Sequence, residues 1–106
     1  MEQTQTSVSQ QDGILIVSCV GVLDEKNSPA IFGSIIKYAK EAPQVAIIDF
    51  TRVLGIKTAF INGALEVIKF IKASGGAVMI IPGGMSDILE ITGLKQMAET
   101  VESIEA

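Results

Sequence analysis

Residues 45–72 read VAIIDFTRVLGIKTAFINGALEVIKFIK, and this stretch decides the fold. Val45–Ile48 is an unbroken apolar run with two isoleucines, which is typical of a central strand covered on both faces. Asp49 and Thr51 are expected to end that strand. From Thr58 onward, apolar residues recur at helical spacing and predict a helix that docks its apolar stripe on a sheet. The stretch therefore predicts a buried strand, a short loop and an amphipathic helix.

Thr58 is predicted to be the N-cap of this helix. Its hydroxyl oxygen would accept a hydrogen bond from an amide near Phe60 or Ile61, and the same helix end favours an anion. A phosphate on that hydroxyl would be stabilised by the amides and by the helix dipole. The pair Lys57-Thr58 is therefore either a modification site or a plain cap beside a solvated lysine.

The helix carries more apolar surface than one sheet face needs. Phe60, Gly63, Val67 and Phe70 lie on a flank beside the main stripe, so the apolar arc covers more than half of the circumference. Packing on a neighbouring helix is one explanation, and a partner-binding surface is the other.

The segments before residue 45 predict a hairpin and a first helix. Gln11-Asp12-Gly13 is a hairpin-type turn between a weak edge strand around residues 4–8 and the apolar run Ile14–Val20. Asn27-Ser28-Pro29 supplies a cap followed by proline at the first helical position, and the helix continues to about Lys40. Pro43 is expected to stop it.

The segments after residue 72 predict alternating elements of shorter length. Ser74-Gly75-Gly76 ends the second helix, Ala77–Ile81 is a buried strand, and Pro82-Gly83-Gly84 is its exit. Ser86 caps a short helix that ends at Gly93, with Leu94 packed back on it, and a weak strand around 97–101 precedes a terminal helical turn. This order predicts an α/β protein with parallel pairing through right-handed crossovers.

Composition limits the classes of function. The chain has 106 residues, 48% of them hydrophobic and 19% charged, with a net charge of −4, which predicts one domain and argues against binding to nucleic-acid phosphates. Its apolar runs are far shorter than the roughly 18 residues of a membrane helix. The single Cys19 makes no internal disulfide and is interpreted as a buried small hydrophobe. No secretory leader is visible, so we expect a cytoplasmic protein that does not bind membranes.

The residue types also argue against an enzyme. The chain has no histidine and one cysteine, so the usual triads, zinc sites and imidazole bases cannot be built, and we expect neither a metal nor a cofactor. The pairs Gly75-Gly76 and Gly83-Gly84 lack the spacing of phosphate-binding loops and are explained as turns. Asp24 and Asp49 each follow a predicted strand, where loop caps are commoner than acid–base pairs.

In this order and spacing, the motifs resemble the STAS domain family, whose type members are bacterial anti-sigma factor antagonists. The resemblance covers nearly the whole chain, 1–106, as a single domain. It implies a small mixed sheet of about four to five strands, with an N-terminal antiparallel hairpin and about three to four covering helices. The matching pieces are Gly21–Asp24, Val45–Thr51 with Val53, Lys57-Thr58-Ala59, Gly75-Gly76 and Ile91–Leu94.

The resemblance also implies roles for single residues. Thr58 matches the phosphoacceptor, Ala59 the residue after it, and Asp49 the acidic residue at the end of the strand. Asp24 closes another matching piece and is expected near the same loop. Lys57 stands where the family has an aspartate, and Phe60 where it has a glycine.

By this resemblance, we expect a non-enzymatic regulator that binds an anti-sigma factor of the serine-kinase type through the Thr58 loop and the following helix. Phosphorylation of Thr58 would weaken that binding, and a phosphatase would reverse it. The alternative is a structural STAS subunit of a larger signalling scaffold or transport assembly, with no phosphorylation switch. Association into a homodimer stays open.

Overall fold

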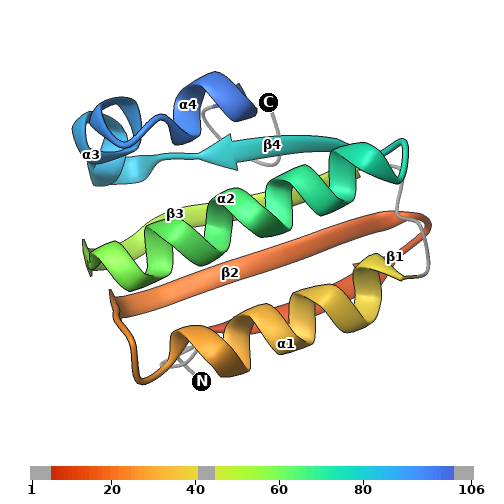
Figure 1. The fold of residues 1–106 in the computed structure, drawn as a ribbon, viewed down its shortest axis with the longest axis horizontal. Helices are drawn as coiled ribbons and strands as arrows, with labels where there is room; N and C mark the ends of the chain where they lie inside the picture. Colours follow the sequence, from red (N-terminus) through yellow and green to blue (C-terminus); the bar gives the residue numbers. More distant parts are fainter. Residues whose placement is uncertain (1–5, 41–44, 102–106) are drawn as a thin grey trace.

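The computed structural model describes residues 6–40 and 45–101. Its centre is a five-stranded sheet in which the strands follow one another in chain order (Figure 1). The first pair is antiparallel and the other three are parallel. The mixed sheet with an N-terminal hairpin is therefore confirmed. The elements are β1 Ser7–Gln11, β2 Ile14–Leu23, α1 Ser28–Ala39, β3 Val45–Ile56, α2 Thr58–Ala73, β4 Ala77–Ile81, η1 Gly83–Met85, α3 Ser86–Ile91, α4 Leu94–Met97 and β5 Glu99–Thr100.

The predicted turns are present where the sequence places them. Asp12 and Gly13 connect β1 to β2 with φ values of 53° and 80°, as the tight turn of a two-residue hairpin requires. Gly75, with φ of 91°, ends α2. Its amide donates to the carbonyl of Lys72 and the amide of Gly76 to that of Ile71, both at 3.0 Å. These two bonds satisfy carbonyls that the last turn would otherwise leave unpaired.

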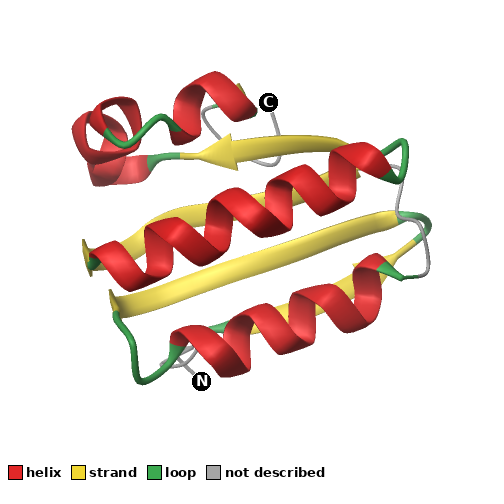
Figure 2. Ribbon diagram, in the orientation of Figure 1, coloured by secondary structure: helices red, strands yellow, loops and turns green. Residues whose placement is uncertain are grey.

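The helices cover one face of the sheet (Figure 2). The side chains of Leu15, Val17, Ala46 and Ile48 point to that face and are buried in the core under α1 and α2. No helix in residues 6–40 and 45–101 covers the opposite face, so the prediction that β3 is covered on both faces is wrong. The apolar run at 45–48 arises because Ile47, on the open face, is itself shielded by the register neighbours Ile16 and Met79.

β3 is much longer than predicted, since it runs to Ile56 and does not end at Asp49. The strand continues past the polar residues because its pairing with β2 is shifted in register at two places. Ser18 pairs with Asp49 and Val20 with Arg52, and a second shift precedes the pair of Val22 and Gly55. At each shift β3 contains one residue more than β2, which is the signature of a β-bulge.

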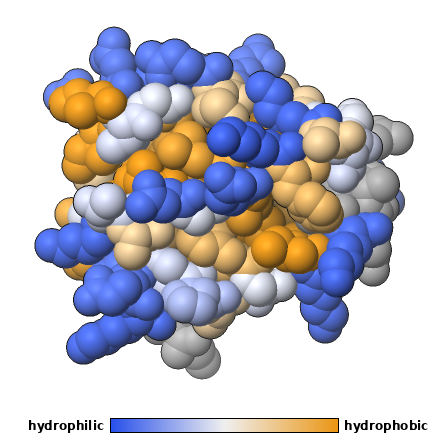
Figure 3. Space-filling view, in the orientation of Figure 1, coloured by the Kyte–Doolittle hydropathy of each residue, from blue (hydrophilic) through white to orange (hydrophobic). Residues whose placement is uncertain are grey.

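The close approach of α1 and α2 explains the broad apolar arc of α2. A methyl group at Gly63 would lie 2.2 Å from the ring of Phe32 in α1, so glycine is required for this contact. The rings of Phe32 and Phe60 stack at a centroid distance of 4.9 Å. The flank of α2 thus packs on a neighbouring helix. Figure 3 views the molecule from the helix side. Apolar surface is visible there in patches among hydrophilic residues.

The C-terminal segment agrees with the prediction only in part. Gly93 has φ of 88° and Leu94 is fully buried, as expected. The expected weak strand around residues 97–101 is present as β5, but it contains only Glu99 and Thr100, because Leu94–Met97 forms the short helix α4. A four-residue helix has too few positions to show a period in sequence. The expected roles of Pro43, residues 4–5 and the terminal helical turn lie outside the described residues.

Candidate functional site

The start of α2 lies beside the end of β2, at the sheet edge where the parallel strands finish (Figure 1). The amide of Lys57 donates to the carbonyl of Leu23 at 2.8 Å and ties the two chain segments together. Thr58 is therefore held next to the turn that begins at Asp24. This edge is also where ligands and partners commonly bind in sheets with parallel strands.

Thr58 is exposed and is the first residue of α2. The N-cap is Lys57, in an extended conformation with φ of −94° and ψ of 161°, so the prediction of Thr58 as N-cap is wrong by one residue. No side chain of the described residues caps this helix, and its first turn contains no acidic residue. The Thr58 hydroxyl is thus not used as a cap, and it stands at an electropositive helix end.

Asp24 has a structural task in the neighbouring turn. Its Oδ1 accepts hydrogen bonds from the amides of Lys26 at 3.0 Å and Asn27 at 3.2 Å, and its own amide donates to Asn27 Oδ1 at 3.0 Å. The hydroxyl of Ser28 donates to the Asp24 carbonyl. Asp24 therefore shapes the entry to α1, as expected of a loop cap.

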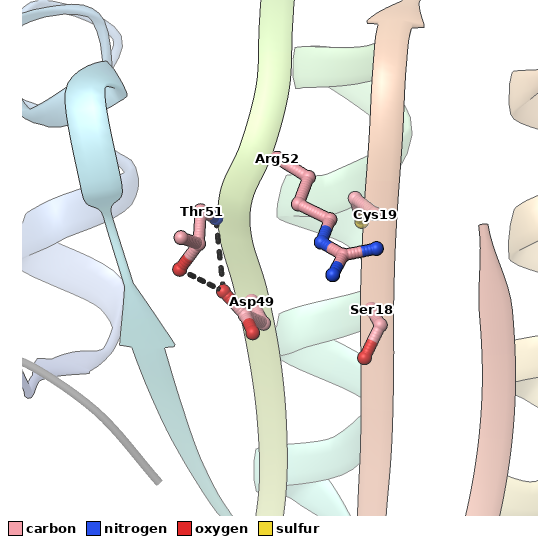
Figure 4. Close-up of a pocket in the computed structure, with 5 residues that line it drawn as sticks. All are labelled: Ser18, Cys19, Asp49, Thr51 and Arg52. Carbon is pink, nitrogen blue, oxygen red and sulfur yellow. Dashed lines mark hydrogen bonds between the residues drawn. The ribbon is translucent and has the colours of Figure 1, made fainter. Parts of the chain in front are cut away.

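Asp49 does not lie near Thr58. It occupies the middle of β3, roughly 20 Å before the end of the strand, and its side chain lies on the open face of the sheet (Figure 4). Its Oδ1 accepts hydrogen bonds from the amide of Thr51 at 2.9 Å and from the Thr51 hydroxyl at 2.5 Å. The prediction that Asp49 neighbours the Thr58 loop is wrong, because it assumed that the strand ends there.

The residues around Asp49 line a separate, open pocket. Its volume is about 240 Å³, and it is lined by Ser18, Cys19, Asp49, Thr51 and Arg52. The first bulge in β3 places Thr51 and Arg52 beside each other here, and the guanidinium of Arg52 extends toward β2 (Figure 4). Burial and the nearby charge of Asp49 raise the pKa of the Cys19 thiol to about 12. Cys19 is therefore an inert core residue, in agreement with its interpretation from sequence.

The flank of α2 predicted to bind a partner is largely closed. Phe60 and Val67 are only 2% and 4% exposed, and Gly63 lies against Phe32. Phe60 and Val67 cannot offer a surface in the folded chain, and Gly63 is only partly exposed, so the prediction of a contiguous flank surface is wrong. The flank is closed because α1 packs on α2. Phe70, 40% exposed, is the one member of the predicted set whose side chain is exposed.

Comparisons with known proteins identify the family of this chain. The family model for the STAS domain matches residues 5–106. The chain belongs to the STAS domain family. No match was found among curated protein sequences.

Solved STAS structures resemble the chain over nearly its full length. An anti-sigma factor antagonist from Mycobacterium paratuberculosis is 20% identical, with 95% of this chain and 87% of that chain covered and a TM-score of 0.80. The antagonist SpoIIAA in its unphosphorylated form is 12% identical, with 94% and 90% covered and a TM-score of 0.76. The Bacillus cell fate determinant SpoIIAA in its phosphorylated form is 14% identical, with 94% and 93% covered and a TM-score of 0.73. These likenesses establish the STAS fold.

Sequence reasoning missed two apolar residues at the same end of this STAS sheet. Leu54 is 80% exposed and Val22 is 42% exposed, although both lie within strands. Leu54 is the extra residue of the second bulge, so it turns away from the core. Gly55, directly after it, was the only sequence signal of an irregular strand.

The described part of the STAS domain offers no metal site and no membrane-spanning helix. No group of three or more His, Cys, Asp or Glu side chains is arranged to hold an ion within residues 6–40 and 45–101. Within the same residues, no helix is long and apolar enough to cross a membrane.

Proposed function

We propose that this STAS domain is a non-enzymatic cytoplasmic antagonist of an anti-sigma factor of the serine-kinase type. It binds that partner through Lys57, Thr58 and Ala59 and the first turn of α2, and phosphorylation of Thr58 releases it. The observation that carries the proposal is the exposed Thr58 at an α2 end that no side chain of the described residues caps. The similarity to anti-sigma factor antagonists supports it.

The chemistry of this helix end is suited to a phosphate switch. A phosphate on Thr58 would add up to about two negative charges beside the amides of the first turn and the Lys57 ammonium. Phe60 and Ile61 already donate their amides to the Lys57 carbonyl, at 3.0 and 3.3 Å, which leaves the amides of Thr58 and Ala59 at the open end. The domain itself would tolerate the phosphate, whereas a partner seated on Thr58 would be repelled.

A second role is favoured by one substitution. Lys57 stands where the resemblance to the family gives aspartate, which argues for a domain without the switch. In that case the chain is a structural STAS subunit of a signalling scaffold or transport assembly, and Thr58 only begins a helix.

A pull-down from native lysate separates the two roles. Wild-type protein is expected to retain a serine-kinase-type anti-sigma factor, and Thr58→Glu to lose it, because a carboxylate at this contact imitates the added charge. Ser34→Glu, which adds the same charge at an exposed site on α1, should bind like wild type. Scaffold or transport subunits retained equally by all three proteins would support the structural role and contradict the switch.

Lys57 is expected to control the rate of Thr58 phosphorylation. A kinase adapted to an acidic neighbour meets a positive charge here, so the wild-type chain should be phosphorylated slowly or not at all. Lys57→Asp should raise the rate by about tenfold or more, as expected for more than about 1.4 kcal/mol of discrimination. Intact mass against time with the cognate kinase measures this, and Thr58→Ala is the blank. Equal rates for both proteins would contradict the expectation.

A further inference from the structure

The proposed function does not use the sheet face that no helix of residues 6–40 and 45–101 covers. Figure 4 views the sheet from this side, with the helices behind the strands. The register places Ile14, Ile16 and Val20 of β2 on this face beside Val45 and Ile47 of β3. Parallel strands are normally covered on both faces, so an open face this rich in apolar residues indicates that it binds something.

The residues of this face are arranged almost symmetrically along the strands. Exposed Ile14 lies at one end and exposed Val22 and Leu54 at the other. Ser18, midway between Ile14 and Val22, pairs with Asp49 at the polar centre. Arg52 is the register partner of Val20, which lies two residues beyond Ser18 along β2. Two apolar ends therefore flank a centre that carries one carboxylate and one guanidinium.

We propose that this face binds the same face of a second copy of the chain. The twofold axis lies between the two faces and crosses the strands close to Ser18, so the strands of the two copies run antiparallel. This arrangement places Val22 and Leu54 of each copy over the Ile14 end of the other. It also brings Arg52 of each copy within reach of the other's Asp49. The two residues are offset by two positions along the strands, roughly 7 Å, which is about the length of an arginine side chain.

Charge and area both fit a second copy as the occupant. Because of the twofold axis, the contact between Arg52 of one copy and Asp49 of the other, which carry opposite charges, occurs twice. β2 and β3 run from the level of Ile14 to that of Val22, whereas β1 and β4 reach only the level of Ser18. With strands about 4.8 Å apart and a rise of about 3.3 Å per residue, this gives roughly 400 Å² of flat face. The pleat and the side chains increase this toward the roughly 800 Å² per partner of a standard stable interface. The inference does not depend on the role of Thr58, which lies at the start of a helix on the other side of the sheet.

Sedimentation velocity from about 5 to 500 µM tests the dimer by mass action. Wild type should shift from one to two chains per particle as concentration rises, and Leu54→Glu or Val22→Asp should weaken association at least about tenfold, since each buries an unpaired charge. Ile91→Glu is the matched control, because Ile91 is 83% exposed on α3, away from this face. A wild type that stays monomeric throughout, or a Leu54→Glu protein that associates like Ile91→Glu, would overturn the proposal.

Cross-linking tests the position of the axis. Ser18→Cys places a thiol from each copy near the axis, so a short bismaleimide should join the two chains at neutral pH. Cys19 is buried and its pKa is raised to about 12, so wild type is the blank. Ser34→Cys, on α1, is the control for collisions in solution. Covalent dimer from Ser18→Cys no greater than from Ser34→Cys would overturn the arrangement.

Discussion

Phe60→Ala is expected to lower the free energy of unfolding by about 3–5 kcal/mol. Phe60 is 2% exposed, and its ring lies 4.9 Å from that of Phe32 and 6.2 Å, edge to face, from that of Phe50. Removal of the ring leaves a cavity where α1, α2 and β3 meet and deletes both aromatic pairs. Urea unfolding followed by circular dichroism measures the loss.

Phe70→Ala on the same helix is the matched control. Its side chain is 40% exposed, so the same chemical change should cost less than about 1.5 kcal/mol. Equal losses in the two variants would show that Phe60 is not the core anchor described here. Partner binding by the folded fraction of Phe60→Ala should stay unchanged, since this ring does not reach the surface.

Gly83→Ala is expected to destabilise the protein by about 2–4 kcal/mol. Gly83 has φ of 55°, and a methyl group on it would lie 2.8 Å from the Thr51 Cα and 3.2 Å from the Phe50 carbonyl oxygen. These are backbone atoms, which no change of rotamer can move aside. The close contact holds η1 on β3 after β4 has ended, so its loss should also loosen α3.

Gly84→Ala separates this strain from a general effect of replacing glycine after β4. Nothing lies within 4 Å of the methyl group at Gly84, and its φ is not positive, so the change should be neutral within about 0.5 kcal/mol. Thermal unfolding of both variants beside wild type makes the comparison. A Gly83→Ala protein as stable as Gly84→Ala would contradict the close approach of η1 to β3.

Local signals predicted most of the elements. The turn at Asp12-Gly13, the proline near the start of α1, the glycines after α2 and α3, and the apolar run of β4 each act within a few residues, and the structure places all of them as predicted. The resemblance to STAS domains, carried by short motifs in fixed order, is confirmed by the family match.

The candidate site was predicted less completely. Thr58 lies where the sequence places it along the chain and is exposed, but the cap falls on Lys57. Asp49 was assigned to the same loop because a polar residue after an apolar run normally ends a strand. The bulges that carry β3 past Asp49 depend on pairing with β2, which lies more than twenty positions away in the sequence, and no local pattern encodes that register.

The sequence by itself determined the α/β order, the positions of the turns and, to within one residue, the start of α2, because each follows from backbone preferences and periodicity over one or two turns of chain. Only the tertiary structure decided which side of α2 is surface. Phe60 and Phe70 are the same residue type on the same apolar arc, and α1 covers one and leaves the other accessible. Burial is a property of the neighbours that a side chain meets, and those neighbours come from distant parts of the chain.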